Sequence, residues 1–204
     1  NDSGAGTLRE IMSGSSGIAD IINFNIVSGC SGGVCVITLS STLVANPGVG
    51  LLYITNEGGT QRIEISGNNS VRVFQVNSGA NLTINNITIR NGRGDGGGIR
   101  NDGTLTMTNC TVSGNSAPGT SGFGGGIANG GTLTMTNCTV SENSTDLAGG
   151  GIRNFSTLTL TNCTVTVNRA LVGGGIFNSG TVNARNTIIA NNSAASGPDF
   201  SGTL

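Results

Sequence analysis

Acidic side chains are the first candidates for chemistry in this chain of 204 residues. Polysaccharide cleavage needs paired carboxylates, or a carboxylate cluster that holds Ca²⁺ beside a basic residue. The best candidate pair is Asp95 and Asp102, with Arg93 or Arg100 nearby. However, Asp102 lies in a segment that is repeated along the chain, as described below, and all the remaining copies have a non-acidic residue at its position. The chain also contains neither His nor Lys. We therefore expect a solvated edge here, with no catalytic residue, no cofactor and no metal.

Cysteine is the second candidate for chemistry. Cys110, Cys138 and Cys163 each follow an Asn at the same place in a repeat, and Ile or Thr replaces them in the flanking copies. This exchange predicts small packing positions with buried free thiols, while disulfides between neighbouring copies or a metal site are the weaker alternatives. Cys30 and Cys35 bracket a short Ser-Gly-Gly-Val loop and form a candidate disulfide, which would fit an oxidising compartment.

The elements that position these residues come from a segment that occurs four times. Its copies begin with GGGIRN, GGGIAN, GGGIRN and GGGIFN, and their isoleucines, 28, 25 and 24 residues apart, are Ile99, Ile127, Ile152 and Ile176. A period this short is one coil of a solenoid, which must stack on its neighbours to bury an apolar face. At about 24 residues per coil, roughly seven or eight coils fit into a single domain over residues 1–204.

Each coil contains three short strands. Residues 104–108 alternate outward Thr with inward Leu and Met, Asn109 breaks the alternation, and residues 110–112 restart it in the opposite sense. The GGGIRN segment adds the third strand, so the coils predict an all-β, three-sided parallel β-helix. The expected inward stacks are Leu82, Leu105, Leu133, Leu158, Val182, and Ile84, Met107, Met135, Leu160. The expected ladder of stacked amides, inward or at a tight corner, is Asn86, Asn109, Asn137, Asn162 and Asn186.

The two ends of the chain differ from the middle. Residues 7–10, TLRE, fit a capping box and predict a short helix in an N-terminal cap over 1–18. We expect irregular early coils over 19–95, four regular coils over 96–196, and the start of a truncated C-terminal stretch over 197–204. Since the chain begins with Asn1, we expect targeting and anchoring segments elsewhere in a longer precursor.

The N-terminal motif resembles a known family. GTLREI, preceded by NDSGAG and followed by IINFNI, is similar to the Ser-Leu-Arg-Glu-Ala-Ile motif of bacterial secreted and surface right-handed β-helix proteins, and NTIIANNSA and GPDFSGT are similar to the stretch after their coils. This chain departs from the family motif at Thr7 and Met12, where the motif has Ser and Ala. The resemblance implies a pectin-lyase-like fold with repeats like those of polymorphic outer-membrane proteins, and a secreted or surface location.

Composition excludes several classes of partner. The net charge is −1 and 9% of the residues are charged, so there is no basic surface for nucleic acid or for an anionic membrane. No apolar run approaches the roughly 18 residues of a membrane span. We expect a surface ligand, either glycan or protein, or end-to-end association of the chain with itself.

Two surfaces are candidates for binding. The first is a face of outward threonines: Thr104, Thr106, Thr108, Thr132, Thr134, Thr136, Thr157, Thr159 and Thr161. The second is the longest insertion between coils, with Ser116, Thr120 and Phe123, and with Phe155 and Phe177 near the next strands. The sequence favours a non-enzymatic, adhesive or structural scaffold. The alternatives are a filament subunit, a polysaccharide-binding or lyase-like enzyme, and an ice-binding protein that uses the Thr ladder.

Overall fold

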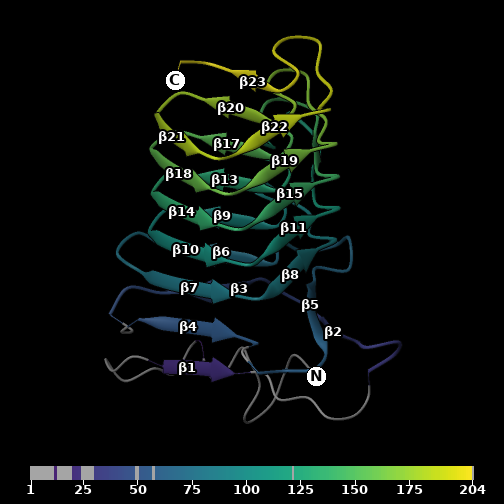
Figure 1. Cartoon of the computed structure of the whole chain (residues 1–204), viewed down its shortest axis with the longest axis vertical. Helices are drawn as coiled ribbons and strands as arrows, with labels where there is room; N and C mark the ends of the chain where they lie inside the picture. The colour runs from purple at the N-terminus through teal and green to yellow at the C-terminus, as the bar shows by residue number, and fades with distance from the viewer. Residues whose placement is uncertain are drawn as a thin grey trace.

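The chain folds into a stack of parallel coils with three long sheets (Figure 1). This computed structural model describes residues 12, 20–23, 30–48, 51–56, 58–120 and 122–203. The capping box at 7–10 lies outside the described residues, and within them Met12 is helical and buried. The expected solenoid is confirmed, and its coils follow one another from the N-terminal to the C-terminal end without a change of sheet order.

Sheet A has seven parallel strands in chain order: β1 (Asp20–Asn23), β4 (Leu52–Thr55), β7 (Asn81–Asn85), β10 (Thr104–Thr108), β14 (Thr132–Thr136), β18 (Thr157–Thr161) and β21 (Thr181–Arg185). Sheet B likewise consists of β2 (Val34–Thr38), β5 (Arg62–Ser66), β8 (Ile87–Arg90), β11 (Thr111–Ser113), β15 (Thr139–Ser141), β19 (Thr164–Thr166) and β22 (Ile188–Ala190). Each coil therefore contributes one strand to each of these sheets.

Sheet C closes the third side with β3 (Leu43–Ala45), β6 (Phe74–Val76), β9 (Ile99–Asn101), β13 (Ile127–Asn129), β17 (Ile152–Asn154), β20 (Ile176–Asn178) and β23 (Phe200–Ser201). A further pair, β12 (Ser116–Ala117) and β16 (Ser144–Thr145), lies between sheets B and C. Because β23 pairs with β20, the segment after 197 continues the coil pattern.

The register matches the stacks expected from the repeat. Leu105 pairs with Leu82 and Leu133, and Met107 pairs with Ile84 and Met135. These side chains are buried, so the alternation along each strand places its apolar residues in one continuous core. The early coils follow the same register, since β4 pairs with β7 and β5 pairs with β8.

Glycine permits the close passage from the loop edge into sheet C. A Cβ atom at Gly126 would lie 2.7 Å from the carbonyl oxygen of Gly151, closer than real Cβ atoms come. The same relation joins Gly151 to Gly175 in the next coil. The triple glycine of each copy is therefore required by backbone packing between coils.

The predicted Asn ladder sits at the corner between sheets A and B. Asn109 has a φ of 54°, in the left-handed region that Asn tolerates better than most residues. The Nδ2 of Asn137 donates to the Oδ1 of Asn109 (3.3 Å), and the Nδ2 of Asn162 donates to Asn137 (3.2 Å). These amides are exposed, so the tight corner was predicted correctly and the alternative of inward side chains was wrong. A one-residue left-handed corner turns the side chain away from the core.

Candidate functional site

The outer surface of sheet C carries a groove. Strand pairing places Arg100, Ala128 and Arg153 in one outward row across β9, β13 and β17. Ala128 is the smallest of the three, and Gly130 follows it at the turn, so the surface is low between two arginines. The result is a hollow of about 300 Å³, lined by Asp95, Arg100, Asp102, Phe123, Ala128, Gly130 and Phe155.

One wall of the groove is a carboxylate–guanidinium cluster. The Nε of Arg100 donates to Asp102 (2.8 Å), and its Nη1 donates to Asp95. The hydrogen bond to Asp102 raises the pKa of Arg100. The second carboxylate oxygen of Asp95 accepts a bond from the backbone N–H of Phe123 (2.9 Å). The two acids that the sequence singled out therefore do lie together, held in place by Arg100, and Arg93 takes no part in these contacts.

The opposite wall is aromatic. The guanidinium carbon of Arg153 lies 3.4 Å from the ring centroid of Phe123, 4.2 Å from that of Phe155 and 5.3 Å from that of Phe177. Its Nε and Nη1 are buried and have no hydrogen-bond partner among the described residues. Burial lowers the pKa of Arg153, but guanidinium pKa values are so high that the charge is retained. Phe155 remains 47% exposed and can contact a ligand.

The insertion that carries Phe123 is anchored to the next coil. The hydroxyl of Thr145 donates to the carbonyl oxygen of Gly122 (2.6 Å), and the carbonyl oxygen of Ala117 also lies within hydrogen-bond distance of it (3.0 Å). The backbone N–H of Gly119 donates to Asp146 (2.7 Å). Of the residues predicted for a binding loop, Phe123 reaches the groove, Ser116 belongs to β12, and Thr120 is exposed.

The predicted Thr face forms the outer surface of sheet A. Thr134 pairs with Thr106 and Thr159, and the same register aligns the rows on either side of it. The three aligned rows contain the nine residues predicted from the sequence: Thr104, Thr132, Thr157; Thr106, Thr134, Thr159; and Thr108, Thr136, Thr161. This face lies on a different side of the coil from the groove of sheet C.

Two further Asn ladders were not predicted, and both are buried. One follows the sheet C strands and contains Asn101, Asn129, Asn154 and Asn178; the other follows the sheet B strands and contains Asn115, Asn143, Asn168 and Asn192. The recurrence of Asn after GGGIx, and of Asn at the second position after the sheet B segments TVS, TVT and IIA, was the signal that could have identified them. They bond the coils together and leave the exposed faces free for binding.

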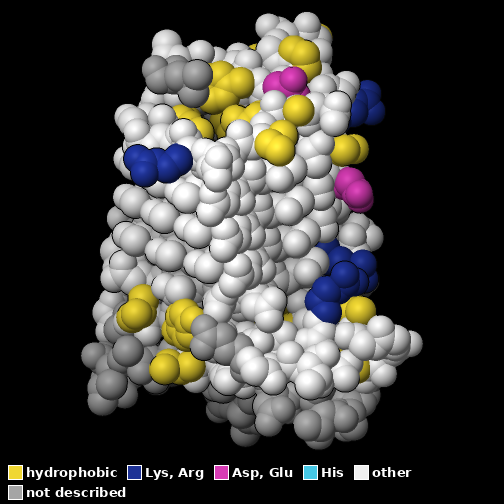
Figure 2. All heavy atoms as spheres, in the orientation of Figure 1, with side chains coloured by type: hydrophobic (Ala, Val, Ile, Leu, Met, Phe, Trp, Pro, Cys, Tyr) yellow, Lys and Arg dark blue, Asp and Glu magenta, His cyan; other side chains and the backbone are white. Residues whose placement is uncertain are grey.

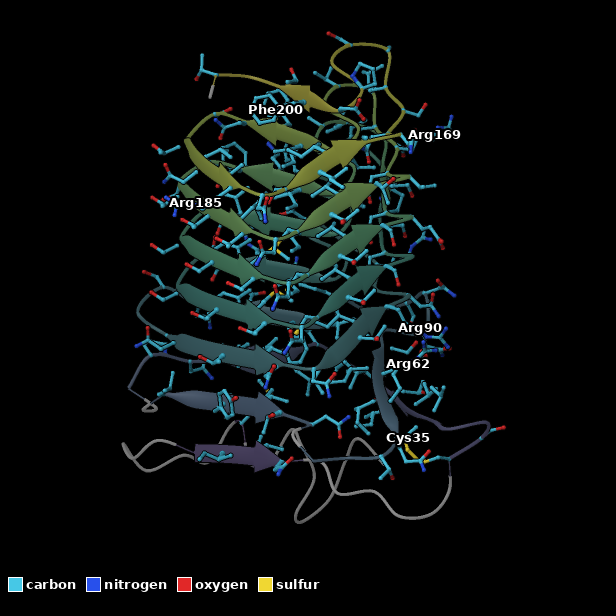
Figure 3. The ribbon with its side chains drawn as sticks, viewed as in Figure 1. Cys35, Arg62, Arg90, Arg169, Arg185 and Phe200 are labelled. Carbon is cyan, nitrogen blue, oxygen red and sulfur yellow. A yellow bond between two sulfur atoms is a disulfide. The ribbon has the colours of Figure 1, made fainter. Side chains whose placement is uncertain are left out.

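The cysteines separate into two groups. Cys110, Cys138 and Cys163 are free and buried, in the packing role that the repeat predicts. Cys30 and Cys35 are joined in a disulfide at the base of the stack (Figure 3). Within the described residues, no three His, Cys, Asp or Glu side chains converge as a potential metal site, and no helix is long and apolar enough to cross a membrane.

Three parallel sheets, in-register coils and polar ladders define a β-solenoid. Comparison with protein families matches residues 11–194 to the right handed beta helix region, and the chain belongs to this family. No curated protein and no solved structure matched the chain.

Proposed function

We propose that this β-helix is a non-enzymatic adhesive scaffold, secreted or displayed on a cell surface, that binds a hydroxyl-rich glycan in the sheet C groove. The observation that carries the proposal is the pairing of an exposed aromatic ring with fixed polar groups across one hollow. A sugar ring presents an apolar C–H face that stacks on an aromatic side chain, and its hydroxyls bond to carboxylates and guanidinium groups. Phe155 supplies the first contact, and Asp102 and Arg100 supply the second.

The arrangement of the acids favours binding over catalysis. Acid–base cleavage of a glycosidic bond needs one carboxyl group that can give up a proton and another that can accept one or attack. Asp95 and Asp102 are instead both bonded to Arg100, which orients them as hydrogen-bond acceptors. The disulfide between Cys30 and Cys35 supports an extracellular location, because disulfides persist mainly in oxidising compartments.

A glycan array tests the proposal. The intact protein should bind a set of hydroxyl-rich glycans, and Phe155→Ala should lower affinity about five- to thirtyfold, because it removes the stacking ring at a cost of about 1–2 kcal/mol. Ile188→Ala, on sheet B, is the matched control, since Ile188 is 61% exposed and belongs to a different side of the coil. An array without any bound glycan would overturn the proposal, and release of new sugar ends from a bound glycan would overturn its non-enzymatic part.

End-to-end association is a second candidate, favoured by the surface around β21. Ala184 is exposed, whereas Leu160, its partner in the preceding coil, is fully buried. A hollow of about 650 Å³ lies here, lined by residues of β18 and β21. Electron microscopy and light scattering over a concentration series test this candidate, because association would appear as filaments and as a mass that rises with concentration.

A further inference from the structure

The outer surfaces of sheets A and B meet at the exposed Asn corner and carry hydroxyl side chains in aligned rows. On sheet A these are the Thr rows described above, with Thr83 extending the central row and Thr181 the first. On sheet B, Thr111 pairs with Thr88 and Thr139, which in turn pairs with Thr164. A second sheet B row contains Ser113, Ser141 and Thr166. The Thr lattice therefore continues around the corner from sheet A to sheet B.

This lattice is held rigidly. Every Thr on sheet A follows or precedes a core residue such as Leu133 or Met135, which is fully buried. The β-branched Thr side chain has few χ1 states, so fixing the backbone also fixes the hydroxyl and the methyl group. At the edge of the lattice, the Nδ2 of Asn186 donates to Asn162 (3.0 Å), in line with the bonds of the preceding coils. The hydroxyls thus repeat at about 4.8 Å across coils and about 7 Å along each strand.

The lattice is also uncharged. From β7 to β18, the outward residues of sheet A are Thr and Asn. Figure 2 shows this region as a continuous uncharged surface, and in the same view of Figure 3 the labelled Arg185 lies at one margin and Arg62 and Arg90 at the other. An ionic polymer finds no opposite charge here. Aromatic side chains, on which sugars stack, are likewise missing from these outward positions between β7 and β18.

We propose that the Thr lattice of sheet A binds ice. Each Thr combines a hydroxyl that can hold an ordered water with a methyl group around which water is restrained. Repeated in two dimensions on a rigid surface, these groups order a layer of water with the regular spacing of the lattice, and this layer can join the surface of an ice crystal. This activity is independent of the sheet C groove, because the two surfaces lie on different sides of the coil.

Thermal hysteresis and partition into a growing ice hemisphere test the proposal with the intact protein. We expect the wild-type protein to show both activities and Thr134→Tyr to lower hysteresis about tenfold or more, since a large ring at the centre of the lattice separates it from a flat crystal. Leu171→Tyr is the matched control, because Leu171 is exposed outside the Thr lattice and should keep full hysteresis. Circular dichroism and melting of both variants separate loss of binding from loss of fold.

Two smaller changes test the chemistry of the contact. Thr134→Val keeps the branched shape and the methyl group and removes the hydroxyl, while Thr134→Ser keeps the hydroxyl and removes the methyl group. If the lattice acts through methyl-restrained water, the Val variant should retain more hysteresis than the Ser variant. Wild-type protein that shows neither hysteresis nor partition into ice would overturn the proposal. Equal activity of Thr134→Tyr and wild type would also overturn it, as would binding of the same face to crystalline cellulose or chitin in place of ice.

Discussion

Replacing Asn143 by Ala should destabilise the protein far more than replacing Asn137 of the exposed ladder by Gly. Asn143 is 1% exposed and lies in the buried ladder that follows sheet B. Its Oδ1 accepts bonds from the backbone N–H of Asn115 (3.0 Å) and from the Nδ2 of Asn115 (2.9 Å). Its Nδ2 donates to the carbonyl oxygen of Val112 and to Asn168, both at 2.9 Å.

The size of the expected loss in stability depends on which hydrogen-bond partners of Asn143 are left without any other partner. The Nδ2 of Asn115 also donates to Ile89, and the Oδ1 of Asn168 also accepts from the backbone N–H of Asn143, so both keep a partner. The backbone N–H of Asn115 would keep no hydrogen-bond partner, and a buried unsatisfied donor costs about 1–3 kcal/mol of stability. With the lost bond to Val112 and the small void left by the amide, we expect a loss of about 3 kcal/mol in the free energy of unfolding.

Asn137→Gly is the control. Asn137 is exposed at the corner with a φ of 54°, a conformation that Gly adopts without strain, so its loss should cost about 1 kcal/mol or less. Guanidinium unfolding measures both variants, and hydrogen exchange locates the loss, because coils of a solenoid interact only with their neighbours. Equal destabilisation by the two substitutions would refute the view that the buried ladder, and not the corner ladder, holds the coils together.

Three further predictions concern the groove, the thiols and the disulfide. Phe123→Ala should remove a stacking contact with Arg153 that is worth about 1–2 kcal/mol. Hydrogen exchange in residues 116–120 should then become faster, and unchanged exchange would contradict the anchoring role of the ring. A hydrogen bond to the neighbouring thiol, together with burial, raises the pKa of Cys138 from 9.0 to about 12. The unfolded thiol therefore loses its proton first, and stability should fall between about pH 9 and pH 12, by less in Cys138→Val. Reducing Cys30–Cys35 should destabilise the first coils by about 2 kcal/mol, because the loop it closes is short, and exchange in β2 would report it.

The coil architecture was predictable because the repeat carries its own register. Superimposing the copies aligns Leu105 with Leu133 and Met107 with Met135, and these pairs are hydrogen-bonded neighbours in the structure. The early coils were harder, since β3 and β6 contain three residues each and lack the GGGI signature. These two strands belong to sheet C because β3 pairs with β6 and β6 pairs with β9. The sequence of one short segment does not reveal such pairing.

The groove was only partly predictable. The proximity of Asp95, Asp102 and Arg100 was expected, because they are near one another in the sequence and lie at the same edge of one coil. The contact between Phe123 and Arg153 joins an insertion to a strand two coils along in the repeat, and the insertion has no counterpart of equal length in other copies. No periodicity places such a loop, so its conformation depends on bonds such as those from Thr145.

The equivalence of neighbouring coils makes the length of this protein a separable property. Residues 127–151 begin at one sheet C isoleucine and end just before the next, so excising them would join Gly126 to Ile152 in the same local sequence, GGGI. The inward residues on each side of that junction already match, because Leu105 of the preceding coil and Leu158 of the following coil both pair with Leu133, which would be removed. Deleting or duplicating one such segment would therefore shorten or lengthen the rod by a whole coil while its cross-section stays constant, so the length of the rod can change independently of the surfaces that it presents.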